Sequence, residues 1–216
     1  HPGLTGAQIA LWPDSAAAET ENEVEATAFM PLRFVSQATW GSPKPADGFA
    51  GFTALAQRIG HGPGWDNISR LPLEDGTYAL TLRGSGSRLT TGSGAEGATA
   101  GFGVDPGATW ALTATPDGYY QVRAVRDGNP TGQCLDVVNG ERFLGAPLED
   151  GAALTQEACD DTTRTQRWQA VARDGNVHLV NAISQLGLAT SQDGTAVQTA
   201  PDVQDPADLR AVAAGE

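Results

Sequence analysis

The stretch Gln133-Cys134-Leu135-Asp136-Val137 and the later tripeptide Gln166-Arg167-Trp168 decide the fold of this chain. Cys159 lies between them and, with Cys134, accounts for both cysteines of the protein. No histidine or further cysteine accompanies them at metal-ligand spacing. The pair therefore predicts a disulfide that closes a loop of about 25 residues and stabilises the fold by roughly 3 kcal/mol. Two free buried thiols are the alternative.

The residues after Cys134 alternate as in a β-strand, in which successive side chains point to opposite faces. If Leu135 and Val137 face the core, the carboxylate of Asp136 faces away from it. Asp136 is then placed to bind a ligand, or it is simply solvated.

This stretch resembles one repeat of the ricin-type β-trefoil lectins, whose hallmark is a Cys-Leu-Asp-Val strand followed by Gln-x-Trp. The matching segments are Cys134 to Val137, Gly151 to Cys159 and Gln166 to Trp168. A trefoil needs three such repeats. An Asp-Gly turn precedes an alternating strand three times, at Asp75-Gly76, Asp117-Gly118 and Asp174-Gly175. The resemblance predicts an all-β fold, a ricin-type β-trefoil over residues 73–216, with a small mixed extension over residues 1–72.

Each repeat is expected to contain a second strand and to close with an apolar segment. The second strands are expected at residues 88–91, 134–137 and 187–190, and the closing segments at residues 110–112, 168–171 and 209–212. Trp110, Trp168 and Leu209 are then equivalent plugs of one shared core, because no single repeat buries its own apolar face.

The resemblance also implies a sugar-binding site. In the lectins, the Asp of the strand accepts hydrogen bonds from sugar hydroxyls, an aromatic residue stacks on the ring, and an Asn or Gln stands just before the tryptophan. Asp136 and Gln166 match this pattern. The aromatic position falls on or near Glu157 and the Asn position on Thr165, and Phe143 is the candidate replacement for the aromatic residue.

The other two repeats depart further from the lectin pattern. The residues at the equivalent positions are Thr90 and Ala189 for Asp136, and Ala108 and Ala207 for Gln166. The resemblance therefore predicts one site, in the middle repeat, with weak glycan binding or none. Galactose-type sugars are the first ligands to test.

The N-terminal extension holds three of the five tryptophans. Residues 14–25 predict a flexible acidic linker or a short solvated helix, and residues 27–40 predict a pair of strands bent at Pro31. Apolar residues from Phe49 to Ile59 recur at helical spacing and predict a short helix that begins after Asp47 and ends at Gly60. The aromatic residues either pack on the trefoil or form a surface for a partner subunit.

The composition bounds the function. A net charge of −13 argues against nucleic acid or an anionic membrane as the partner. Few lysines, many acidic residues and the expected disulfide favour a secreted, extracellular bacterial protein, and a chain that begins at His1 is typical of a mature or trimmed product.

Catalytic and cofactor-binding motifs are not found in the sequence. A copper site at His1 with His61 or His178 is disfavoured, because the trefoil repeats already account for most of the residues that such an enzyme fold needs. The prediction is a non-enzymatic lectin without cofactors. The alternative is a lectin-like subunit of a multi-subunit secreted bacterial toxin, in which the trefoil serves as a scaffold for partner subunits.

Overall fold

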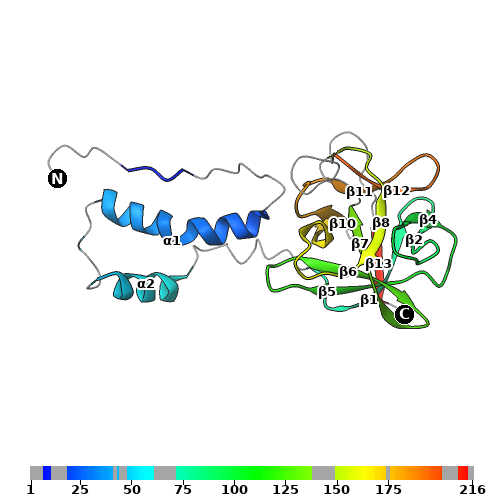
Figure 1. The fold of residues 1–216 in the computed structure, drawn as a ribbon, viewed down its shortest axis with the longest axis horizontal. Coiled ribbons are helices and arrows are strands. Elements are labelled where there is room, and N and C mark those ends of the chain that lie inside the picture. Colours follow the sequence, from blue (N-terminus) through cyan, green and yellow to red (C-terminus); the bar gives the residue numbers. More distant parts are fainter. Residues whose placement is uncertain are drawn as a thin grey trace. The chain divides into compact units, whose positions relative to one another are not determined.

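The computed structural model describes residues 7–10, 19–40, 43, 48–60, 72–137, 149–173, 176–200 and 209–213. The chain divides into two compact units (Figure 1). The N-terminal unit comprises residues 1–14 and 21–69, and the C-terminal unit comprises residues 15–20 and 70–216.

The described part of the N-terminal unit consists mainly of two helices, α1 (Glu21–Thr39) and α2 (Gly48–Ile59). Helix α2 confirms the helical spacing of the apolar residues. It is followed by Gly60, whose N–H bonds the carbonyl of Ala56 and whose φ of +65° suits glycine. The expected cap, Asp47, lies outside the described residues. Neither described helix is both long and apolar enough to cross a lipid bilayer.

The strand pair expected over residues 27–40 is wrong, because residues 27–39 belong to α1. The helix opens with Glu- and Ala-rich sequence of high helix propensity, and its early glutamates are favourable at the positive end of the helix dipole. Pro31 lies inside α1, where it removes one backbone hydrogen bond without ending the helix. The acidic segment expected over residues 14–25 is thus helical from Glu21 onward.

In the described part of the C-terminal unit, six antiparallel strands close into a barrel. They are β1 (Gly76–Leu82), β5 (Trp110–Ala114), β6 (Tyr120–Arg126), β9 (Trp168–Arg173), β10 (Asn176–Asn181) and β13 (Leu209–Ala213). Each pairs with the next in this order, and β13 pairs back with β1. Closure leaves none of the six with an unpaired edge.

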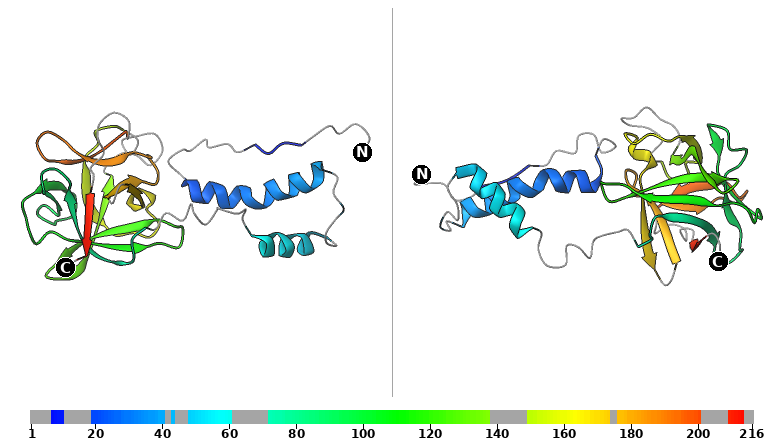
Figure 2. Two further views of the ribbon diagram at one scale, coloured as in Figure 1. Left: turned by 180° about the vertical axis from the view of Figure 1, so that it is seen from behind. Right: turned by 90° about the horizontal axis from the view of Figure 1, so that it is seen from below.

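Three hairpins accompany the barrel (Figure 2). They are β2 (Arg88–Thr90) with β4 (Gly101–Gly103), β7 (Asn129–Val137) with β8 (Leu154–Ala158), and β11 (Gly187–Thr190) with β12 (Ala196–Thr199). A short strand, β3 (Ala98–Thr99), pairs with β8, and single bridges tie Gly101 to Thr195 and Ala153 to Val197. The expected repeats, each with two barrel strands and one hairpin, are confirmed.

The core contains equivalent buried residues from each of the three repeats. Leu89, Leu135 and Leu188 are fully buried at equivalent positions of the three hairpins, and so are the expected plugs Trp110, Trp168 and Leu209. The indole N–H groups of the two tryptophans donate to the carbonyls of Leu89 and Leu135, each at 2.9 Å. Trp110 and Trp168 are therefore equivalent in contact as well as in position, whereas Leu209 shares their burial but has no side-chain N–H to donate.

Candidate functional site

The predicted disulfide joins Cys134 of β7 to Cys159, the residue after β8, with an S–S distance of 2.08 Å. The alternative of two free thiols is therefore wrong. The backbone N–H of Cys159 also bonds the carbonyl of Gly132 at 2.9 Å. The disulfide thus cross-links β7 and β8 at the end of the hairpin that lies away from its loop. Asp136 lies on this hairpin.

The register of β7 and β8 brings three polar side chains to one face of the hairpin. Asp136 pairs with Thr155, and Cys134 pairs with Glu157 two residues along. Side chains opposite each other across two strands share a face. Asp136, Thr155 and Glu157, together called the middle-repeat site, therefore lie on the face away from the buried Leu135.

Asp136 is held in place by Gln166 rather than solvated, since only 6% of its surface is exposed. Gln166 lies in a 3₁₀ turn, η3 (Arg164–Gln166), and its Nε2 donates to Asp136 Oδ2 at 2.9 Å and to the carbonyl of Ala158 at 2.9 Å. Its Oε1 accepts from the N–H of Asp160 at 3.0 Å. Gln166 thus bonds the carboxylate of Asp136 and also the residues on both sides of Cys159, Ala158 and Asp160.

The other predicted site residues fall in different places. Glu157 belongs to the site, where its Oε1 accepts a hydrogen bond from Thr155 Oγ1 at 2.9 Å. The assignment of this position to the aromatic residue of the lectin pattern stays a prediction. The backbone carbonyl of Thr165 accepts a hydrogen bond from Asn181 Nδ2 at 2.7 Å. Phe143 lies outside the described residues.

The sequence pattern did not indicate three residues that hold the site. Thr155 is found only from the register of β7 with β8. Asn181, at the end of β10, reaches the turn before Trp168 from the following repeat. Arg167 anchors the same turn through the carbonyl of Asp161 and an ion pair with Asp117, at 3.3 Å from Nε to Oδ2.

The equivalent positions of the other two hairpins lack carboxylates. They are Thr90, Gly101 and Gly103 in the first repeat, and Ala189, Val197 and Thr199 in the third. The hydroxyl of Thr90 bonds the carbonyl of Gly101 at 3.0 Å. The position of Gln166 is taken by the buried Ala108 in the first repeat, and the third-repeat residue, Ala207, lies outside the described residues.

An acidic residue of the third repeat has a structural role. The hydroxyl of Ser191 and the backbone N–H of Thr195 both donate to Asp193 Oδ1, and these hydrogen bonds, that of Ser191 first, lower the pKa of Asp193 to about 2. Asp193 therefore closes the β11–β12 turn. Among the described residues, no group of three or more His, Cys, Asp or Glu side chains is arranged to hold a metal ion.

The repeats can now be compared with known proteins. Residues 129–200 match the family described as "Ricin-type beta-trefoil lectin domain-like". This chain carries a ricin-type β-trefoil domain. The trefoil aligns with the designed three-fold symmetric protein ThreeFoil at 27% identity and a TM-score of 0.54, over 64% of this chain and 99% of that one. It also shares its fold with the Rhizoctonia solani agglutinin, at 16% identity and a TM-score of 0.52, over 65% of this chain and 96% of the agglutinin.

One relative extends the likeness beyond the trefoil. A lacto-N-biosidase of Bifidobacterium bifidum is 30% identical over 199 residues, which cover 86% of this chain but only 16% of that protein. Because 86% of 216 residues is about 186, and residues 70–216 number 147, the match includes part of the N-terminal unit. The match to this much longer protein therefore covers parts of both units of this chain.

Proposed function

We propose that this chain is the glycan-binding part of a secreted bacterial protein, and that the glycan binds at the middle-repeat site. The proposal rests on one observation, the Asp136 carboxylate fixed by Gln166. Of the three equivalent hairpin positions, the other two hold Thr90 and Ala189.

The chemistry of the site suits a polyol. A carboxylate accepts charge-assisted hydrogen bonds from neighbouring sugar hydroxyls, and a carboxylate that is already fixed loses little freedom when the sugar binds. Thr155 and Glu157 add a hydroxyl and a second carboxylate on the same face. Because Asp136 exposes little of its surface and no aromatic ring occupies the position of Glu157, we expect weak binding, with a Kd on the order of millimolar.

One relative supports a role for this chain as a glycan-binding part of an enzyme. The similar B. bifidum protein is named for its action on a glycan, and this chain spans only 16% of it. We infer that the chain has no catalysis of its own and holds a glycan for other parts of a larger protein. Secretion is part of the proposal and is supported by the disulfide, which persists in oxidising compartments. Galactose-type sugars remain the first ligands to test.

Replacement of Asp136 by asparagine tests the proposal. Asparagine keeps an oxygen that accepts from Gln166 but removes the charge, so the fold is expected to persist. Glycan binding is expected to weaken at least tenfold, because a hydrogen bond to a charged group contributes roughly 1.5–3 kcal/mol. The measurement is a glycan-array screen of the unmodified protein, followed by titration calorimetry of both proteins with the best ligand.

Thr90→Ala is the matched control, since it alters the same position of the first repeat. It is expected to leave glycan affinity unchanged. Equal affinity of the unmodified protein and Asp136→Asn would contradict the assignment of the site. The absence of any glycan binding at millimolar sugar would contradict the function itself.

Replacement of Glu157 by tryptophan is expected to strengthen binding. The indole would supply the flat apolar face that stacks on a pyranose ring, which contributes about 1–1.5 kcal/mol, or close to tenfold in Kd. Glu157 is half-buried beside Thr155, so the exchange lies at the site and outside the core. Titration with the same sugar measures the change, and Glu157→Gln separates stacking from loss of charge. A tryptophan variant that binds no better than Glu157→Gln would mean that the sugar ring does not lie over this position.

A further inference from the structure

The helical hairpin, formed by α1 and α2, has almost no interior of its own. Among its described residues only Ala28 and Ala56 are buried. The helices touch through the rings of Phe34 and Phe52, whose centroids are 6.1 Å apart in an edge-to-face arrangement. Two helices with so little buried apolar surface are marginal alone, because most helix stability in proteins comes from packing.

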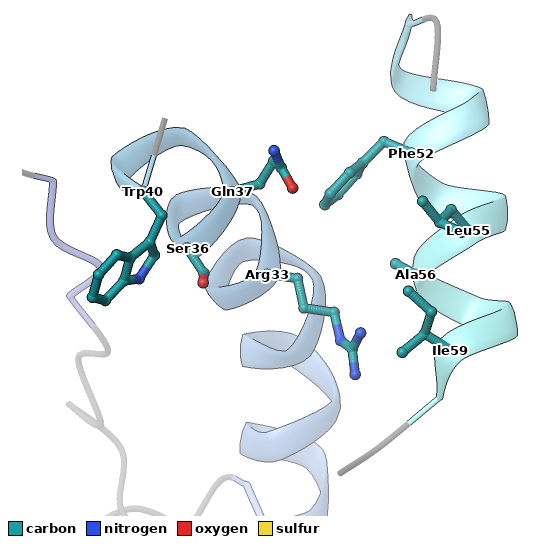
Figure 3. Close-up of a pocket in the computed structure, with 8 residues that line it drawn as sticks. All are labelled: Arg33, Ser36, Gln37, Trp40, Phe52, Leu55, Ala56 and Ile59. Carbon is teal, nitrogen blue, oxygen red and sulfur yellow. The ribbon is translucent and has the colours of Figure 1, made fainter. Parts of the chain in front are cut away.

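A groove of about 390 Å³ lies between the two helices (Figure 3). Its α2 wall is apolar and its α1 wall is largely polar. The lining residues are Phe52, Leu55, Ala56 and Ile59 on α2, Arg33, Ser36 and Gln37 on α1, and Trp40 directly after α1. Figure 3 shows Arg33 and Gln37 directed toward α2, while the indole of Trp40 points away from it.

The exposed apolar side chains of the described residues concentrate on the hairpin. Five of the seven large ones lie there, namely Leu32, Phe34, Trp40, Phe49 and Ile59. The other two, Val104 and Val171, are isolated on the trefoil. The described surface of the trefoil therefore has no apolar patch to match the hairpin. Among the described residues, the apolar surface that matches one hairpin is therefore that of a second hairpin.

The charges on the hairpin favour the same arrangement. Glutamates 21, 23 and 25 occupy the start of α1, whereas Arg33 lies further along it and Arg58 lies in the last turn of α2. Arg33 already donates to the carbonyl of Gly60 and lies over the ring of Phe29 in its own hairpin. Antiparallel pairing about a two-fold axis would bring the acidic end of each hairpin toward Arg58 of its partner.

The exposed area is sufficient for a reversible dimer. Trp40 is 82% exposed, Phe49 77% and Phe34 57%. At about 150–250 Å² for a whole aromatic side chain, and with Leu32 and Ile59 added, roughly 600 Å² is available on each copy. Twice that area lies at the lower end of specific protein interfaces, where affinities are on the order of micromolar.

We propose that two copies of this chain dimerise through their helical hairpins, with apolar side chains of each hairpin covering the groove of the other. The arrangement is a four-helix assembly with two-fold symmetry. It gives the dimer two middle-repeat sites, a consequence that rests on the proposed glycan function. The dimer itself does not depend on that function.

The test is sedimentation equilibrium of the whole chain over a range of concentrations, without sugar. The mass is expected to rise from 22.3 kDa toward twice that value with increasing concentration. The double variant Trp40→Ser/Phe49→Ser is expected to raise the dimer Kd at least tenfold, since buried aromatic anchors dominate interface energies. Arg58→Glu, which leaves the apolar face intact, is expected to weaken the dimer as well.

Val104→Ser is the matched control, because it removes the most exposed large apolar side chain among the described trefoil residues and is expected to leave the Kd unchanged. Far-UV circular dichroism reports whether each variant keeps its helices. A mass of one chain at every concentration would overturn the proposal and would mean that the hairpin covers its own trefoil or binds another protein. A dimer that persists undiminished in both the double variant and Arg58→Glu would also overturn it.

Discussion

Replacement of Trp168 by alanine is expected to lower the free energy of unfolding by about 3–5 kcal/mol, the usual range for removal of a buried tryptophan. The indole is fully buried in the core cluster, and its N–H bonds the carbonyl of Leu135 at 2.9 Å. The substitution leaves a cavity and also releases the residue next to Asp136. Urea unfolding followed by circular dichroism measures the loss, and glycan binding is expected to fall with it.

Trp168→Phe is the control, because it retains most of the ring volume but loses the N–H donor. It is expected to cost about 1–2 kcal/mol, and Trp110→Phe is expected to cost a similar amount, since Trp110 makes the same bond to Leu89. A Trp168→Ala protein within about 1 kcal/mol of the unmodified protein would contradict the shared core.

Removal of the disulfide is expected to cost roughly 3 kcal/mol, the chain-entropy value for a loop of 25 residues. The variant is Cys134→Ser/Cys159→Ser. Because Gln166 bonds the residues on both sides of Cys159 as well as Asp136, the variant is also expected to bind glycan more weakly. Chemical unfolding and sugar titration of the same preparation measure the two effects.

Reduction of the unmodified protein supplies the control for the disulfide. Dithiothreitol is expected to bring its unfolding midpoint close to that of the double serine variant and to leave the variant itself unchanged. If the serine variant binds glycan as tightly as the unmodified protein, the disulfide stabilises the fold without positioning the site.

The trefoil was predictable because its sequence repeats. Trp110 and Trp168 mark two closing strands, and the hairpin strands alternate apolar and polar residues, so the pattern indicated both the topology and the plugs. The helix over residues 27–40 was missed because Pro31 and several bulky apolar residues are typical of a bent strand. The helix-favouring Glu and Ala residues before them decided the outcome.

The site was only partly predictable. Asp136 and Gln166 follow a sequence pattern, and the structure joins them by a hydrogen bond. Thr155 depends on the register between two strands, and Asn181 acts from another repeat, so neither has a signal in the local sequence. The helical surface could not be located either, because exposure of Trp40 and Phe49 depends on how the helices pair.

The alternation along the hairpin strands separates positions that the shared core determines from positions that it does not. At one position, Leu89, Leu135 and Leu188 are the same residue, whereas the next position reads Thr90, Asp136 and Ala189. Adjacent residues thus differ because one faces the shared interior and the other faces away from it. The three hairpins therefore keep one shared interior while the residue beside the core leucine differs from copy to copy, and of these three positions only the middle one carries a carboxylate.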